Sequence, residues 1–235
     1  MGEGTLESFG PGLQWHNGEP AEWSVTGKGE VVVKPTPQLD YWSRTFYEPC
    51  LRKHDGQTLL TTVQADEEVT LTTCFTLEPR AQFDQAGVMI RVDDNCWVKA
   101  GIEFCDGVPR LSCVVTNDGF SDWSTQKYEQ WDDGAGATSL RLRIHKLNPG
   151  PEQGPCFVFE AAPYKPGDTA DSPAPWSFVR IASLRSGSEP WKMGLFCFAP
   201  VEQAGCRAHF HHFQLGPKKS PEHSGDSSGM KSTDA

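Results

Sequence analysis

The chain has 235 residues, of which 37% are hydrophobic and 22% charged, and its formal net charge is −10. The sequence contains no run of Lys and Arg, so nucleic acid and anionic membrane surfaces are excluded as expected partners. No stretch reaches the ~18 apolar residues that a membrane-spanning helix needs. Residues 1–17 lack the basic and apolar regions of a signal peptide, so we expect a cytoplasmic protein.

The eight cysteines are even in number, which is compatible with disulfide pairing. Without a secretory signal, however, reduced thiols are the better interpretation. No C-x-x-C pair occurs, so the sequence gives no support for a structural zinc site.

Apolar and polar residues alternate with a period of two along most of the chain, and helical periodicity is almost absent. With 23 Gly and 18 Pro to form turns, this pattern predicts an all-β protein. In chain order, we expect strands at Val31–Val33, Thr58–Ala65, Val69–Leu77, Ala86–Val92, Trp97–Phe104, Leu111–Thr116, Leu140–Leu147, Cys156–Ala161, Met193–Ala199 and Ala208–Leu215.

Four segments do not follow the strand pattern. A helical turn is expected near Trp176–Leu184, a loose start at Gly2–Gly12, and a loop at Tyr164–Pro175 that borders a site. Pro217–Ala235 lacks aromatic residues and has one β-branched residue, Thr233, which predicts a disordered tail. The expected organisation is one domain over residues 5–216, followed by a tail over residues 217–235.

Residues 85–116 predict a three-stranded hairpin array with tight turns at Asp93–Asn95 and at Asp106-Gly107. These turns would pair Gln85 with Glu103 and Arg110, Gly87 with Gly101 and Ser112, and Met89 with Lys99 and Val114. One face would be the core, with Val88, Ile90, Val98, Ala100, Ile102, Phe104, Leu111, Cys113 and Val115.

The opposite face of this array is the candidate site. Two adjacent glycines, Gly87 and Gly101, weaken a sheet and often mark the close approach of another group. They would form a shallow floor with walls from Gln85, Arg91, Trp97, Lys99 and Glu103. The alternative is the ordinary solvated face of an antiparallel sheet.

The run F-D-Q-A-G-V-M-I-R-V-D…W-V-K-A-G-I-E-F-C-D-G within Phe83–Ser124 resembles the core signature of the DUF1349 family, also called the regulation-of-enolase family. The stretch D-Y-W-S-R-T-F-Y at Asp40–Tyr47 fits the same family, and the resemblance covers roughly residues 13–216. It implies a two-sheet antiparallel jelly-roll sandwich of the concanavalin A-like superfamily. In that superfamily the concave sheet face binds carbohydrate, and the hairpin face above would supply the concave floor.

The chemistry of a glucanase is not visible in the sequence. The superfamily's E-x-D-x-E motif is absent, because Glu103 and Asp106 have the wrong spacing and Asp66-Glu67-Glu68 lies at an expected turn. We therefore expect no catalytic residues, although Glu103 with an acid from another strand, Asp40 or Asp122, remains an alternative. His209 and His211 would share one strand face, but no carboxylate partner is placed beside them, so neither a metal nor a cofactor is expected.

The leading hypothesis is a non-catalytic, lectin-like protein that binds a sugar or an anionic sugar derivative on its concave face. Arg91, Lys99 and Arg110 cluster there against an acidic background, which favours a sugar phosphate as much as a neutral glycan. The rival hypothesis is a regulator that docks on a metabolic enzyme such as enolase. The expected ligand-binding residues are Gln85, Arg91, Trp97, Lys99, Glu103, Trp42 and Tyr47, with Gly87 and Gly101 as the floor.

Overall fold

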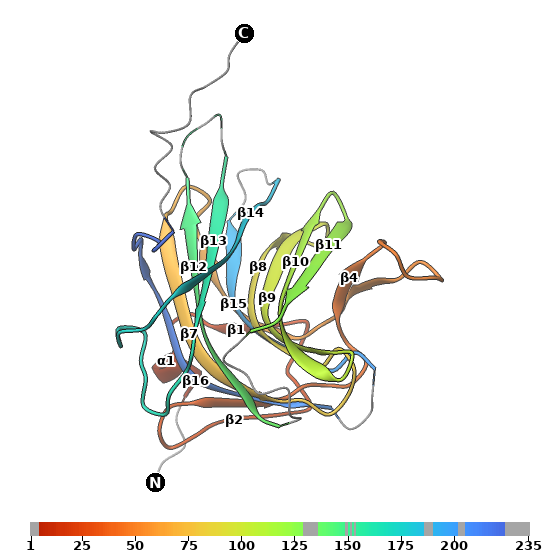
Figure 1. The fold of residues 1–235 in the computed structure, drawn as a ribbon, viewed down its shortest axis with the longest axis horizontal. Helices are drawn as coiled ribbons and strands as arrows, with labels where there is room; N and C mark the ends of the chain where they lie inside the picture. The colour runs from red at the N-terminus through yellow and green to blue at the C-terminus, as the bar shows by residue number, and fades with distance from the viewer. Residues whose placement is uncertain are drawn as a thin grey trace.

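The structure is a computed structural model, and it describes residues 5–128, 136–148, 150, 152, 154–185, 190–201 and 205–223. Over this part of the chain, two seven-stranded antiparallel sheets pack face to face as a sandwich (Figure 1). The predicted all-β, two-sheet antiparallel fold is thus confirmed. None of the described helices is long and apolar enough to cross a membrane.

Sheet A contains, in spatial order, β1 (Gln14–His16), β6 (Thr58–Val63), β15 (Trp191–Phe198), β8 (Gln85–Asp93), β9 (Cys96–Cys105), β10 (Val108–Asn117) and β11 (Phe120–Gln126). Sheet B contains β14 (Ser177–Ser183), β13 (Cys156–Ala162), β12 (Thr138–Leu147), β7 (Val69–Glu78), β16 (Arg207–Pro217), β3 (Val31–Lys34) and β2 (Glu22–Val25). A small separate sheet pairs β4 (Tyr41–Ser43) with β5 (Arg52–His54), and α1 (Leu6–Phe9) precedes β1.

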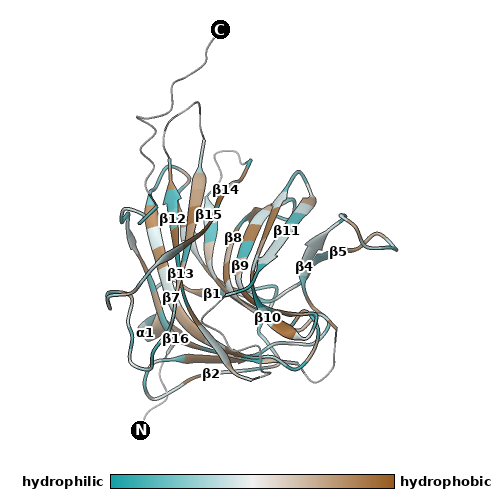
Figure 2. Ribbon diagram, viewed as in Figure 1, coloured by the Kyte–Doolittle hydropathy of each residue, from teal (hydrophilic) through white to brown (hydrophobic). Residues whose placement is uncertain are grey.

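The core lies between the two sheets, where the inward side chains of both meet. Figure 2 shows the underlying pattern as brown and teal bands that alternate along β8, β9 and β12. Eight of the nine residues expected on the core face of the hairpin array are buried in this core between the sheets, and Phe104, which is half-buried, is the exception. Sheet B contributes the large buried rings Phe75, Phe157, Phe159 and Phe210. Burial of these apolar faces is the main driving force for the sandwich.

All ten predicted strands occur, and the register of the hairpin array is confirmed pair by pair. Gln85 pairs with Glu103, and Gly87 pairs with Gly101. Glu103 in turn pairs with Arg110. The register was predictable because two tight turns fix it and a slip by one residue would turn the whole apolar set towards solvent.

Two expectations about local structure are wrong. Trp176–Leu184 is not a helical turn, because β14 occupies Ser177–Ser183 and pairs with β13 at the sheet edge. The four-residue spacing of Trp176, Arg180 and Leu184 imitates a helix, but pairing with the neighbouring strand decides the structure. From residue 5 onwards, the expected loose start is also ordered, since Thr5 and Ser8 form a capping box that begins α1, while Gly2–Gly4 lie outside the described residues.

The boundary of the tail also needs correction. Residues 218–223 contact sheet B, although they were expected to belong to a disordered tail from residue 217. Lys219 donates its backbone N–H to Thr70 Oγ1 at 2.8 Å, and Glu222 donates its own to Glu160 Oε1 at 2.6 Å. The ring of His223 stacks on Phe178 at 4.4 Å. Polar backbone contacts hold this segment, which a search for apolar docking residues does not detect. Residues 224–235 lie outside the described residues.

Candidate functional site

A segment over residues 37–56, which includes β4 and β5, covers part of the outer face of sheet A. Figure 1 shows sheet B, sheet A and β4 side by side in that order. Tyr41 and Trp42 from this covering segment join Met89, Trp97 and Phe198 of sheet A in a second apolar cluster. The Tyr41 ring centroid lies 5.5 Å from that of Trp97 and 5.9 Å from that of Phe198. The face that was expected to be an open floor is therefore partly a second core.

Polar contacts from distant parts of the chain hold the covering segment in place. Asn17, which adopts a positive φ of 63°, directs its side-chain amide to the backbone oxygens of His54 (2.8 Å) and Gly56 (3.1 Å) and to the Tyr41 hydroxyl (3.0 Å). At the other end, the Ser43 hydroxyl donates to the backbone oxygen of Gly119 at 2.8 Å. The segment is consequently a fixed wall of the site.

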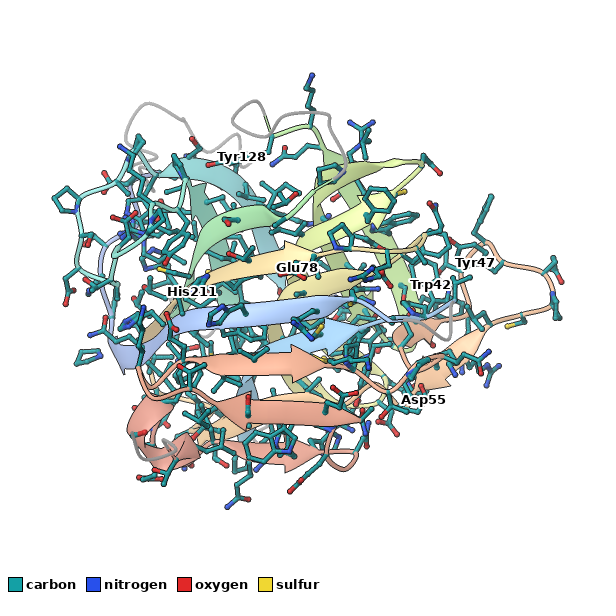
Figure 3. The ribbon with its side chains drawn as sticks, turned by 90° about the horizontal axis from the view of Figure 1, so that it is seen from below. Trp42, Tyr47, Asp55, Glu78, Tyr128 and His211 are labelled. Atoms are coloured by element: carbon teal, nitrogen blue, oxygen red, sulfur yellow. The ribbon has the colours of Figure 1, made fainter. Side chains whose placement is uncertain are left out.

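Beside this cluster, a pocket of about 210 Å³ opens between the covering segment and sheet A. This volume is below the range of about 300–1,000 Å³ that is usual for drug-sized ligands, so the pocket suits one small molecule. Its lining comprises Asp40, Trp42, Tyr47, Leu51, Phe83, Gln85, Lys99, Glu103, Val114, Trp123, Pro200 and Val201. Aromatic side chains form its walls, and Figure 3 shows Trp42 and Tyr47 together at this side of the molecule.

The polar side of the pocket has two carboxyl groups. Asp40 accepts hydrogen bonds from Lys99 Nζ at 2.9 Å and from Gln85 Nε2 at 3.3 Å. Glu103 accepts from the Ser112 hydroxyl at 2.5 Å and from Trp123 Nε1 at 3.1 Å. All of these acceptors and donors come from β8, β9, β10, β11 and the covering segment, so the sheet register sets their positions.

The two carboxyl groups differ in their electrostatic surroundings. Burial raises the pKa of Glu103, and the opposing effects of the Lys99 charge and the Ser112 hydrogen bond do not cancel it. Burial also raises the pKa of Tyr47, and the charge of Glu103 adds to that shift. The buried Glu103 carboxyl therefore holds its proton more readily than an exposed glutamate does. Asp40 supplies a second carboxylate in the same pocket, whereas Asp122 is 74% exposed and pairs with Arg180 at 3.4 Å.

Five of the nine expected ligand-binding residues line the pocket: Gln85, Lys99, Glu103, Trp42 and Tyr47. The structure places the other four outside its lining. Trp97 is fully buried in the second apolar cluster, and its Nε1 donates to the Asp94 backbone oxygen at 3.2 Å. Arg91 pairs with the Asp94 carboxylate at 2.5 Å.

Gly87 and Gly101 do not form an open floor. A Cβ on Gly87 would lie 2.1 Å from the Ala100 backbone oxygen, and one on Gly101 would lie 2.0 Å from the Ala86 oxygen. A side chain at an ordinary strand position projects out of the sheet. At Gly87 and Gly101 it would instead collide with the neighbouring strand, so the glycines are required for strand packing.

Sequence reasoning did not assign several pocket residues to the site. Asp40 was considered only as an alternative acid. The other lining residues that were not among the expected ligand-binding residues are Trp123, Phe83, Leu51, Val114, Pro200 and Val201. The pairing of Val114 with Trp123 across β10 and β11 could have indicated Trp123, had β11 been recognised as a strand. Leu51 and Pro200 had no comparable signal, because their place depends on the path of loops.

The charges in the pocket do not favour an anionic ligand. The Lys99 ammonium group is already paired with Asp40, and Arg91 is paired elsewhere. With Glu103 protonated, the pocket side chains therefore have no net charge, and with Glu103 ionised they have one net negative charge. Two carboxyl groups beside aromatic walls suit a neutral ligand that carries several hydroxyl groups.

Comparison with known proteins agrees with this architecture. The family model described as "Protein of unknown function (DUF1349)" matches residues 15–218. A protein of Saccharomyces cerevisiae named "Regulation of enolase protein 1" is 38% identical over 193 residues, which is 80% of this chain and 81% of that protein. An uncharacterised protein of Emericella nidulans is 30% identical over 99 residues, which is 40% of this chain and 48% of that protein.

Solved structures give the same result for the fold. A crystal structure of a functionally unknown protein from Saccharomyces cerevisiae superposes with a TM-score of 0.71 at 26% identity, and covers 89% of this chain and 98% of that one. A bifunctional GH43-CE protein of Bacteroides eggerthii superposes with a TM-score of 0.61 at 16% identity. This likeness covers 89% of the present chain and 24% of the Bacteroides chain, so it concerns the sandwich fold alone.

Proposed function

Because the chain belongs to the DUF1349 family, whose description assigns no activity, we propose its function from the pocket: non-catalytic binding of a small neutral sugar or polyol between the covering segment and sheet A. The observation that supports this most strongly is the pair of carboxyl groups, Asp40 and Glu103, set among the rings of Trp42, Tyr47 and Trp123. Carboxylate oxygens accept hydrogen bonds from hydroxyl groups, and aromatic faces stack on the apolar face of a sugar ring.

The size and charge of the pocket define the ligand further. A volume of about 210 Å³ fits one small ring better than a chain of linked rings. The pairing of Lys99 with Asp40 leaves no unpaired cation among the described residues that line the pocket, so a neutral sugar is preferred over the sugar phosphate that the sequence also allowed. The cytoplasmic location stays a prediction.

The test is calorimetric titration of the full chain with a panel of neutral monosaccharides and polyols, followed by saturation-transfer NMR on any binder. Glu103→Gln keeps the size of the side chain but replaces one carboxyl oxygen with an amide NH2 group, and we expect it to weaken binding about tenfold, since a buried polar group left without its hydrogen-bond partner costs about 1–3 kcal/mol. Leu51→Trp should fill the pocket and abolish binding, while its neighbour Arg52, outside the lining, provides the matched control Arg52→Trp. No binder in the panel, or equal affinity in all three variants, would refute the proposal.

A second candidate function is docking on a metabolic enzyme, and the tip of the covering segment supports it. Phe46 is 88% exposed at this tip, and the Arg44 guanidinium lies 4.9 Å above the exposed ring of Phe120. Exposed aromatic and arginine side chains are enriched at protein interfaces. The name of the Saccharomyces relative points to enolase as the first enzyme to test.

This second function separates from the first by mutation. If the protein docks on enolase, Phe46→Ala should weaken its binding to purified enolase in biolayer interferometry, and Leu51→Trp should leave that binding unchanged. If the pocket is the functional site, Leu51→Trp should abolish sugar binding and Phe46→Ala should leave sugar binding unchanged. Absence of measurable association with enolase by the wild-type chain would rule out this candidate.

A further inference from the structure

A second cluster of polar side chains lies on the outer face of sheet B. It comprises Glu30, which immediately precedes β3, and His209 and His211 of β16. Figure 3 shows His211 on the opposite side of the molecule from Trp42 and Tyr47. The cluster is therefore separate from the pocket. It also contains the carboxylate partner that the sequence did not place beside the histidines.

The backbone of β16 brings the two imidazole rings together. The register with β7 shifts between Phe210 and His212, so His211 is the extra residue of a β-bulge. Alternate residues of a regular strand are about 6.6 Å apart. Here the ring centroids of His209 and His211 are 4.2 Å apart, and both rings are turned towards Glu30.

One carboxylate group faces both rings. His209 Nε2 lies 3.2 Å from Glu30 Oε2, and His211 Nδ1 lies 3.3 Å from Glu30 Oε1. The three atoms that could ligate a metal ion, one from each side chain, are all within 4.8 Å of one another. Metal–ligand bonds of about 2.0–2.2 Å in tetrahedral geometry separate two ligand atoms by about 3.4 Å. The observed spacing thus leaves room for one ion among the three side chains after small adjustments.

Neighbouring groups hold the cluster in this orientation. His211 Nε2 is 2.9 Å from Thr76 Oγ1, which in turn is 2.8 Å from the hydroxyl of Ser139. The Tyr164 ring stacks on His211 with centroids 4.7 Å apart and an angle of 8° between the planes. A hydrogen bond on the second ring nitrogen and a packed ring face are the usual supports of a metal-binding histidine.

We propose that Glu30, His209 and His211 bind one divalent transition-metal ion of the Zn²⁺ class at an open, three-ligand site. Two imidazoles and one carboxylate suit Zn²⁺ and its neighbours, whereas Mg²⁺ and Ca²⁺ prefer oxygen ligands throughout. The His209 side chain is 33% exposed, so water can reach the ion and complete its coordination. The ion would tie the β2–β3 turn to β16 on the outer face of sheet B.

The test is calorimetric titration of the full chain with ZnCl₂ and separately with MgCl₂, in a Cys50→Ser background because Cys50 is an exposed free thiol. We expect one Zn²⁺ per chain and no measurable Mg²⁺ binding. Glu30→Gln and His209→Ala should each weaken Zn²⁺ binding at least tenfold. His16→Ala, which changes a half-buried histidine of sheet A, should leave it unchanged.

A second readout separates binding from folding. Co²⁺ added to the background chain should give visible absorption bands from an imidazole–carboxylate site, and His209→Ala should abolish them while its far-UV circular dichroism stays that of the parent. Absence of Zn²⁺ binding by the parent chain would overturn the proposal. So would Zn²⁺ binding of undiminished affinity in both cluster variants, because the ion would then be bound elsewhere.

Discussion

The ammonium group of Lys99 lies 2.9 Å from a carboxylate oxygen of Asp40, and only 4% of the lysine side chain is exposed. Lys99 belongs to β9 in the middle of sheet A, and Asp40 precedes β4 in the covering segment. This ion pair therefore links the covering segment to the sheet at the polar side of the pocket.

Removing one partner of this pair should be much more harmful than removing both. Asp40→Ala leaves a buried, unpaired ammonium group, and we expect it to lower the free energy of unfolding by about 3–5 kcal/mol. Asp40→Ala with Lys99→Met should recover part of that loss, as measured by urea denaturation of the double-mutant cycle. Glu22→Ala, which breaks the exposed pair with Lys34, should lower the free energy of unfolding far less, because solvent screens that pair. Equal effects of Asp40→Ala and Glu22→Ala would contradict this view of the pocket.

Gly101→Ala should destabilise the protein, because the added Cβ would meet the Ala86 backbone oxygen at 2.0 Å. The strands must move apart to admit it, and overpacking of this kind costs about 1–3 kcal/mol. Gly216→Ala is the matched strand control, since nothing lies within 4 Å of the position that its Cβ would occupy. Thermal denaturation of the two variants measures the difference. A Gly101→Ala variant as stable as the control would show that the strands are not in close contact there.

Truncation after Gly216 should lower the melting temperature, whereas truncation after His223 should preserve it. The shorter chain loses the backbone N–H groups of Glu222 and His223, which donate to Glu160 Oε1 at 2.6 and 3.3 Å. A lost hydrogen bond to a charged group destabilises by about 1.5–3 kcal/mol. Differential scanning calorimetry of the full chain and the two truncated chains measures their melting temperatures. Identical melting temperatures would mean that residues 217–223 contribute nothing to stability.

Glu160 should make the protein sensitive to acid. Burial alone would raise the pKa of this carboxyl, but hydrogen bonds from His145 and Arg143 and the Arg143 charge outweigh burial and lower the pKa to about 2. The folded state therefore binds the proton less readily than the unfolded chain, whose ordinary pKa is 4.5. This contribution to stability is present above about pH 4.5 and is lost as the pH falls towards about 2.

Urea denaturation of Glu160→Gln across that pH window measures the effect. The variant should be less stable than the wild type above pH 4.5, and the difference should shrink as the pH approaches 2. Glu48→Gln, which changes an exposed carboxyl, should follow the wild-type curve. A constant difference between Glu160→Gln and the wild type at every pH would disprove the linkage.

The sequence predicted the sandwich well and the pocket only in part, because local patterns determine the sheet register whereas long-range contacts determine the position of the covering segment. The register that places Gln85, Lys99 and Glu103 on one face follows from alternation and two tight turns, which are local features. The covering segment is different, because β4 and β5 have three residues each and show no sustained alternation. Its position depends on contacts such as that of Asn17 with Gly56, 39 residues away, and no local pattern encodes them.

The same limit explains why Trp97 and Arg91 were assigned to the site. Their alternation places them on the outer face of sheet A, and this much is correct. What covers that face, however, is decided by Tyr41 from another part of the chain, which packs against Trp97 and makes it part of a core. In the same way, the partner of His209 and His211 is Glu30, which precedes them by about 180 residues.

The order of strands in sheet B also constrains how the chain is assembled during synthesis. Among the described residues, β16 is the last strand, and it lies between β3 and β7, so it connects the β2–β3 hairpin to the rest of that sheet. Until residue 217 has left the ribosome, β3 and β7 each expose an unpaired edge, and an unpaired edge can recruit strands from other molecules. We expect nascent chains that stop short of β16 to need protection by chaperones, and the sandwich to close in one late step when β16 inserts.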